Sequence, residues 1–288
     1  MKRTLLAIAL LIFHFSFKVE AQIATPAQFN LKIFADSISA GAASNYEKAE
    51  KVVRWLAKNF DWTATDYKKR TVEEIIARQG GNCNELAMVT TALLKELNLQ
   101  MRKIREINIH RESLERRASA QQKIQEKGNR MSVFGKRHND HVWLEIYDDK
   151  SGAWIPADPS LGVIGEQQWI EARAGFGKRF TMNPISEDMI VPIAIFATDE
   201  KGNLIENRTP HYVVDGLNRI YDNKLANFKN WKKWKEGVGA LDEKCWTAFL
   251  GEVNLHDYEN QIDALAVVYN DLKTEYRTSQ QSKSQQQR

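Results

Sequence analysis

The apolar and polar positions of the chain follow two periods, one helical and one strand-like. After Ser44, apolar residues recur at helical spacing, which predicts a helix with a buried face. The residues after Cys83 are apolar enough to predict a helix buried on most sides. Residues 141–147 alternate strictly instead, which predicts a strand with two distinct faces. One face would carry His141, Trp143, Glu145 and Tyr147, and the other Val142, Leu144 and Ile146. A weaker alternation predicts an earlier strand over residues 100–110.

A hairpin is predicted directly after the strand at residues 141–147. The polar turn at residues 148–152 leads into residues 153–159, a short strand that ends at a proline. Because the second strand returns antiparallel to the first, the hairpin brings Asp158 back towards His141.

Three predicted helices begin at capping signals. These are Ser44 with Glu47, the run Thr71-Val72-Glu73-Glu74, and Asn82 with Glu85. Gly80 and Gly81 precede the last of them, and we expect them to turn the backbone sharply and to leave room for a substrate. Cys83 is therefore predicted at the first position of a helix that continues to about Leu97.

Beyond residue 161 the pattern is less regular. Residues 190–198 and 210–214 are strand-like, and helices dominate from Leu217, including residues 217–228 and 257–276. The predicted organisation is a signal peptide (1–21), an N-terminal arm (22–43), a core (44–184) with a charged, exposed insertion (111–137), a mainly helical C-terminal extension (185–277) and a disordered tail (278–288).

The first 21 residues have a basic start, a short apolar run and small residues before the predicted cut, as secretory signal peptides do. The apolar run is too short to span a bilayer. We therefore expect an exported protein, periplasmic or secreted, without a stable membrane anchor. Removing the peptide lowers the formal net charge from +4 to +2. A chain so close to neutral is not expected to bind nucleic acid.

The two cysteines, Cys83 and Cys245, allow two interpretations. In an exported protein they suggest a disulfide, which here would close a loop of about 160 residues. Alternatively, Cys83 is a nucleophile, because a helix N-terminus favours the thiolate through its dipole and its free N–H groups. Cys245 would then be a free, buried thiol. A nucleophilic cysteine also needs a base and a group that orients the base, and His141 and Asp158 are the candidates.

Three segments together resemble the transglutaminase-like superfamily of papain-related thiol enzymes. They are Gly81-Asn82-Cys83, His141-Val142-Trp143-Leu144-Glu145 and Trp154-Ile155-Pro156-Ala157-Asp158-Pro159-Ser160. The resemblance covers about residues 45–165. It implies an α+β fold in which the cysteine-bearing helix packs on an antiparallel sheet.

The resemblance also implies a role for each site residue. Cys83 would be the nucleophile, His141 the general base and acid, and Asp158 the carboxylate that orients His141. The chemistry would be acyl transfer from an amide of a peptide or protein, through a thioester, to an amine or to water. The oxyanion hole would use the Cys83 backbone N–H and a second donor from Gln79 or Trp62.

One departure from the family leaves the substrate open. Asn84 follows the cysteine where animal transglutaminases carry an aromatic residue, which weakens the case for protein cross-linking specifically. No residues have metal-ligand spacing, so we expect no metal and no cofactor. Two other hypotheses stay open: a non-catalytic module that binds a peptide or a wall component, and a structural domain in which Cys83 pairs with Cys245.

Overall fold

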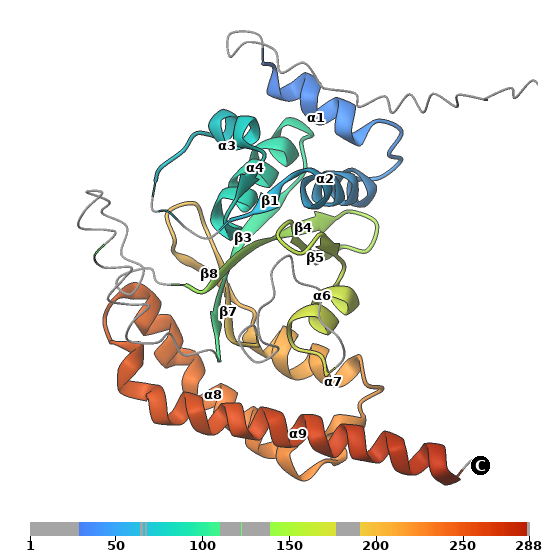
Figure 1. The fold of residues 1–288 in the computed structure, drawn as a ribbon, viewed down its shortest axis with the longest axis vertical. Coiled ribbons are helices and arrows are strands. Elements are labelled where there is room, and N and C mark those ends of the chain that lie inside the picture. The colour runs from blue at the N-terminus through green and yellow to red at the C-terminus, as the bar shows by residue number, and fades with distance from the viewer. Residues whose placement is uncertain are drawn as a thin grey trace, which may run out of the picture.

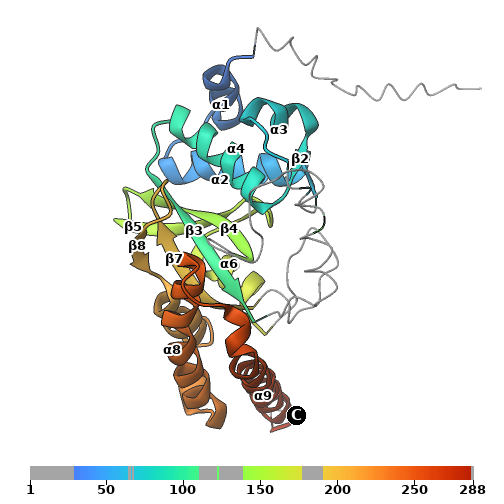
Figure 2. The same ribbon diagram turned by 90° about the vertical axis from the view of Figure 1, so that its left-hand side faces the viewer.

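The fold is built on a six-stranded sheet that lies between two sets of helices (Figure 1, Figure 2). The computed structural model describes residues 29–63, 66, 68–109, 122, 139–176 and 191–286. The predicted signal peptide at residues 1–21 and almost all of the insertion at residues 111–137 lie outside these ranges. The antiparallel sheet, its covering helices and the mainly helical C-terminal region confirm the predicted α+β fold class.

All neighbouring strands of this sheet are antiparallel, in the order β6-β5-β4-β3-β7-β8. The strands are β3 (Met101–Asn108), β4 (His141–Asp148), β5 (Ala153–Asp158), β6 (Val163–Ile164), β7 (Pro192–Thr198) and β8 (Leu204–Asn207). β4 and β5 form the predicted hairpin. Two very short strands, β1 (Asp61–Trp62) and β2 (Gly80–Gly81), form a separate parallel pair.

The helices of the N-terminal part cover one face of the sheet (Figure 2). They are α1 (Leu31–Ser39), α2 (Asn45–Asn59), α3 (Val72–Arg78) and α4 (Cys83–Glu96). α2 and α4 lie on the strands, and α1 packs on both of these helices. Val142, Leu144 and Ile146 of β4 point into this core, as the alternation of the sequence predicts.

The later part of the chain covers the opposite face (Figure 2). Its elements are α6 (Glu166–Arg173), the π-helix η2 (Pro210–Gly216), α7 (Leu217–Arg219), the 3₁₀-helices η3 (Lys224–Asn227) and η4 (Leu255–Tyr258), α8 (Lys229–Leu250) and α9 (Glu259–Gln286). Trp143 of β4 points into this second core and packs on Trp169, with ring centroids 4.3 Å apart. None of the helices in the described ranges is both long and apolar enough to cross a membrane.

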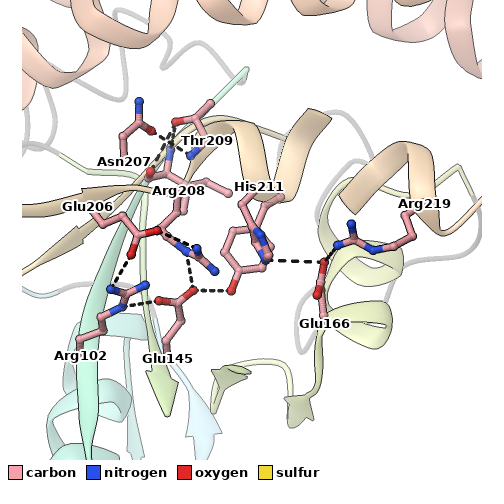
Figure 3. Close-up of polar contacts among 11 residues, drawn as sticks. Arg102, Glu145, Glu166, Glu206, Asn207, Arg208, Thr209, His211 and Arg219 are labelled. Carbon is pink, nitrogen blue, oxygen red and sulfur yellow. Dashed lines mark hydrogen bonds and ion pairs between the residues drawn. The ribbon is translucent and has the colours of Figure 1, made fainter. Parts of the chain in front are cut away.

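Glu145 of β4 fastens η2 to this second face through a buried charged cluster (Figure 3). One oxygen of the Glu145 carboxylate accepts a hydrogen bond from Arg102 Nε at 2.5 Å. The other accepts from Arg208 Nε at 2.9 Å and from the Tyr212 hydroxyl at 2.5 Å. Glu206 binds both arginines, at 2.7 and 2.9 Å. The cluster therefore joins β3, β4, β8 and η2.

Two segments in which the sequence predicts no helix are helical. α1 lies within the N-terminal arm, where the Asn30 side chain caps it by accepting the Ile33 N–H at 3.0 Å. Burial of Ala35 against the neighbouring helices stabilises this short helix. α9 ends at Gln286 and includes residues 278–286 of the tail predicted to be disordered. The Gln, Lys and Arg residues of that tail are polar but are good helix formers, so polarity alone predicts the wrong state.

Two other segments adopt different elements from those predicted. Residues 210–214, predicted as strand-like, belong to η2, because an apolar run this short does not distinguish a strand from a helix and the contacts of Tyr212 favour the helix. The helix predicted over residues 217–228 is divided into α7 and η3. Asp222 and Asn223 separate them, with left-handed φ values of 54° and 60°.

Candidate functional site

Cys83 is the first residue of α4, and a capping box fixes this end of the helix. Asn82 Oδ1 accepts the Glu85 N–H at 3.0 Å, and Glu85 Oε2 accepts the Asn82 N–H at 3.1 Å. The predicted box and the predicted helix start are both confirmed. The half-buried thiol therefore lies at the positive end of the helix dipole.

Gly80 and Gly81 serve close packing rather than the sharp turn that the sequence predicts. A Cβ atom at Gly80 would lie 2.9 Å from the backbone oxygen of Asp61, and one at Gly81 would lie 2.8 Å from Cβ of Glu85. Real Cβ atoms do not approach other atoms so closely, so neither position accepts a larger residue without a shift. The left-handed residue that ends α3 is Gln79, with a φ of 52°.

The β4–β5 hairpin brings His141 and Asp158 into contact. His141 Nε2 lies 2.7 Å from Asp158 Oδ2, and their exposed fractions are 7% and 0%. The other carboxylate oxygen, Oδ1, accepts hydrogen bonds from Ser160, at 3.1 Å from its backbone N–H and 2.6 Å from its hydroxyl. Sequence reasoning gave Ser160 no role. The Asp-Pro-Ser order was the available signal, because Asp side chains often bind the backbone N–H two residues later.

The Cys83 thiol completes this arrangement from the helix side. It lies beside the His141 side chain and the backbone N–H of Val142, and both lower its pKa. Since His141 Nε2 faces Asp158, Nδ1 is the ring nitrogen left for the thiol. The structure thus brings together the three side chains that the sequence singled out, although they come from three different elements.

The charges of the three groups support one another. Burial raises the pKa of the Cys83 thiol, but its hydrogen bond to His141, the charge of His141 and the Val142 N–H outweigh this effect and lower the pKa overall. Burial lowers the pKa of His141, but the Asp158 carboxylate outweighs it and raises the pKa to about 10. Burial raises the pKa of Asp158, but the charge of His141 outweighs burial, so the pKa is lowered overall. This arrangement favours a thiolate beside an imidazolium ion.

Glu85 has a second function beside capping. Its buried carboxylate binds Arg70 Nη1 at 2.7 Å and lies 3.6 Å from Arg78 Nη1. Arg70 also pairs with Asp66. The arginines offset a negative charge two residues from Cys83 that would otherwise oppose thiolate formation. Sequence reasoning missed these arginines because no local pattern connects them to Glu85.

Cys245 is not bonded to Cys83. Both cysteines are free, and they belong to different cores, on opposite faces of the sheet. Burial, with smaller contributions from Asp242 and Asp140, raises the pKa of Cys245 far above the usual thiol value. The hypothesis of a structural Cys83–Cys245 disulfide is therefore wrong, and Cys245 is a buried, inert thiol.

Side chains that bind metals do not cluster in the described ranges. In that part of the chain, no three His, Cys, Asp or Glu residues are placed to hold an ion together. The candidate site described here thus consists of a thiol, an imidazole and a carboxylate, supported by a serine.

A family comparison matches part of the chain. Residues 32–159 match the model of the Transglutaminase-like superfamily. This stretch contains Cys83, His141 and Asp158 and ends before α6. No curated protein matches the chain in sequence.

Three solved structures are similar to the chain at low sequence identity. A candidate cysteine protease from Cytophaga hutchinsonii is 18% identical, with 47% of this chain and 39% of that chain covered and a TM-score of 0.32. A candidate protease from Parabacteroides distasonis is 12% identical, with coverages of 62% and 27% and a TM-score of 0.36. A Rad4–Rad23 complex bound to a 6-4 photoproduct UV lesion is 12% identical, with coverages of 84% and 54% and a TM-score of 0.36. The chain thus spans about a quarter to a half of the chains it matches.

Proposed function

Because the chain carries a transglutaminase-like superfamily domain over residues 32–159, we propose that it is a thiol enzyme acting on amide bonds of peptides or proteins. Cys83 is the nucleophile, His141 the general acid and base, and Asp158 the group that orients His141. Two observations carry this proposal. His141 Nε2 lies 2.7 Å from Asp158 Oδ2, and the half-buried Cys83 thiol at the helix start has a pKa that His141 lowers.

The first half of the reaction forms a thioester. The Cys83 thiolate attacks the carbonyl carbon of the amide, and the Cys83 backbone N–H at the start of α4 stabilises the developing oxyanion. Gln79 or Trp62, which flank the Gly80–Gly81 strand, supplies a second donor. As the carbon–nitrogen bond breaks, the His141 imidazolium gives its proton to the leaving amine, and the acyl group stays on sulfur.

The second half returns the enzyme to its starting state. A water molecule or an acceptor amine loses a proton to neutral His141 as it attacks the thioester carbon. The carbon–sulfur bond breaks and leaves the thiolate beside the imidazolium ion. Asp158 stabilises that imidazolium at both stages, and Ser160 holds Asp158 with one oxygen directed at His141.

Covalent trapping tests this proposal directly. A peptide aldehyde or a peptidyl acyloxymethyl ketone mimics the amide carbonyl, and intact-mass analysis reports the adduct. We expect one adduct per wild-type molecule, none in Cys83→Ala, and one in Cys245→Ala, which is the matched control. A folded wild-type protein that binds the peptide part without forming an adduct would favour the alternative, a non-catalytic module that binds a peptide or a wall component.

The acceptor is tested separately. A peptide amide incubated with and without a primary amine gives either the free acid or the amine conjugate, and mass spectrometry distinguishes the two. Conjugate formation that needs Cys83 would assign transamidation, and acid alone would assign hydrolysis.

We also infer that the enzyme is exported. This rests on the signal-peptide pattern of residues 1–21, which lie outside the described ranges. Expression of the full chain in a bacterium, followed by fractionation and N-terminal sequencing, tests it. Export predicts an extracytoplasmic protein that begins near Gln22, whereas an intact Met1 in the cytoplasm would contradict it.

A further inference from the structure

We propose that Arg173, held by Glu106, is a positioning residue for the His141–Asp158 pair. It would keep Asp158 charged and His141 ready to release its proton. The inference rests on the proposed function for its meaning in catalysis, but it concerns a buried ion pair that can be tested without a substrate. Arg173 belongs to α6, which lies beyond the stretch that matches the superfamily.

Glu106 places a buried carboxylate beside His141. The two residues are opposite each other in the β3–β4 register, so their side chains leave the same face of the sheet as neighbours. Glu106 is fully buried, and its carboxylate accepts a hydrogen bond from Trp143 Nε1 at 3.0 Å. Its other oxygen pairs with Arg173 Nη2. The imidazole therefore has an ion pair beneath it as well as Asp158 beside it.

α6 is built so that Arg173 reaches this position. The helix follows β6 after Gly165, whose N–H donates to the Pro156 carbonyl of β5 at 2.9 Å. Trp169, one turn before Arg173, stacks on Trp143. These contacts hold the helix against the back of the hairpin, and the Arg173 side chain is only 4% exposed.

Burial of Arg173 has a desolvation cost that its ion pair with Glu106 offsets only in part. In the described part of the chain, the buried Arg173 Nε has no hydrogen-bond partner. An unsatisfied donor and a desolvated charge both reduce stability, and an apolar residue of similar volume would avoid this cost. Its charge gives the residue a function that an apolar side chain could not supply.

The ionisable groups that face His141 come from four elements. They are Cys83 of α4, Asp158 of β5, Glu106 of β3 and Arg173 of α6. Burial and then the charge of Asp158 are the largest influences on the pKa of His141, and the charge of Arg173 follows and lowers it. Burial raises the pKa of Asp158, while His141 and then Arg173 lower it. Arg173 thus stabilises the carboxylate and limits how tightly the imidazole holds its proton.

This balance matters for the leaving-group step. An imidazolium that holds its proton too tightly is a poor general acid, whereas a neutral Asp158 could not orient the ring. Arg173 prevents both outcomes without touching the substrate. Glu106 fixes the guanidinium and offsets part of its charge, so that the imidazolium still forms.

Histidine titration tests the inference without a substrate. The purified protein, labelled with ¹³C in its histidine rings, is titrated by ring carbon–proton NMR, and His141→Asn identifies the His141 signal. Arg173→Met should raise the apparent pKa of His141 by about half a unit or more, because a nearby positive charge is lost. Glu106→Gln should shift it downwards, because Arg173 then acts alone. Arg173→Lys should restore the wild-type value.

Controls separate charge from folding. Arg173→Met leaves Glu106 unpaired, so the double variant E106Q/R173M is made as well. It keeps an acceptor for Trp143 and should show a smaller upward shift, because the loss of Glu106 offsets part of the loss of Arg173. Arg208→Met breaks the other buried cluster of the sheet and should lower the melting temperature with no change in the His141 titration. A folded double variant with the wild-type His141 titration would overturn the inference.

The outcome is independent of the trapping experiment. Shifted titrations in a protein that forms no adduct would retain the positioning role and reject the enzymatic one. Unshifted titrations in a protein that forms the adduct would reject the positioning role alone.

Discussion

The strand β4 carries a buried charged cluster towards each end, and the two clusters use their charges differently. Towards its C-terminal end, the Glu145 carboxylate receives Arg102 on one oxygen and Arg208 and Tyr212 on the other (Figure 3). At its N-terminal end, His141 links the equally buried Asp158 to a thiol that is only half-buried.

The comparison shows that burial of charge does not by itself mark a reactive site. Both clusters are desolvated, and both carboxylates have partners on both oxygens. The Glu145 cluster leads from a buried carboxylate through two arginines to the exposed Glu206 and ties elements together. The His141 cluster ends instead at the half-buried thiol of Cys83, the proposed nucleophile. The two clusters therefore differ in the group at which each ends, a charged side chain in one and a thiol in the other, and not in whether they carry buried charge.

The largest expected difference between the two clusters is in reactivity. His141→Ala should slow acylation of Cys83 by a peptidyl electrophile by about 10³-fold or more, because the thiolate loses its cationic partner and its proton donor. Stopped-flow or quenched-flow mass spectrometry measures this rate. Glu145→Gln, four residues away on the same strand, is the matched control and should remain within a few-fold of wild type. Equal losses in two folded variants would remove the distinction.

For the free energy of unfolding, we expect the Glu145 cluster to matter more than the His141 cluster. Glu145→Ala should lower the free energy of unfolding by about 3–5 kcal/mol, since it leaves two buried arginines without their shared carboxylate. Urea denaturation followed by far-UV circular dichroism measures the loss. Asp158→Asn should cost clearly less, because its amide oxygen still accepts from Ser160 and His141 can become neutral. A larger loss in Asp158→Asn would show that the site is also the main stabilising cluster.

The pH dependence of Cys83 alkylation sharpens the same comparison. Its lowered pKa means that thiolate persists as the pH falls below about 8.5, and the raised pKa of His141 keeps the imidazolium until the pH rises through about 10. An ordinary thiol loses about 100-fold in reactivity with iodoacetamide between pH 8 and pH 6. Cys83 should lose much less, and His141→Ala should restore the steep fall. A steep fall in the wild type would count against the ion pair.

The smallest effect concerns the helix start beneath the thiol. Asn82→Ala should lower stability by about 1 kcal/mol through loss of the cap, and it should also move the Cys83 alkylation profile to higher pH. Thr71→Ala removes the corresponding box of α3 and is the matched control. It should lose similar stability with the Cys83 profile unchanged. If both variants shift the alkylation profile equally, the shift results from a general loss of stability and not from loss of the Asn82 cap.

Local patterns were enough to predict the elements that carry the three site residues. The Asn82–Glu85 box, the strict alternation of β4 and the tight hairpin each depend on residues close in sequence. Together they place Cys83 at a helix start and Asp158 near His141. The family resemblance supplied the packing of helix on sheet, which periodicity alone does not give.

The buried ion pairs around the site residues could not be predicted from local patterns. Glu106 and Arg173 are 67 positions apart and meet only because α6 folds back behind the hairpin. Arg70 reaches Glu85 for a comparable tertiary reason. Residues 210–214 of η2 have a strand-like pattern, but Tyr212 and the neighbouring Arg208 bind Glu145, which is more than 60 positions away, and no local pattern predicts these contacts.

The central position of β3 in the sheet affects the order in which the strands can assemble during folding. All three site residues precede β7 in the chain, yet β7 forms the ladder on the free side of β3. Until β7 arrives, β3 presents an open edge of unpaired backbone groups, a surface on which other chains can aggregate. A chain shortened after β5 would therefore hold the reactive groups on an unfinished sheet. The segment that follows the three site residues thus closes the sheet edge on which they depend.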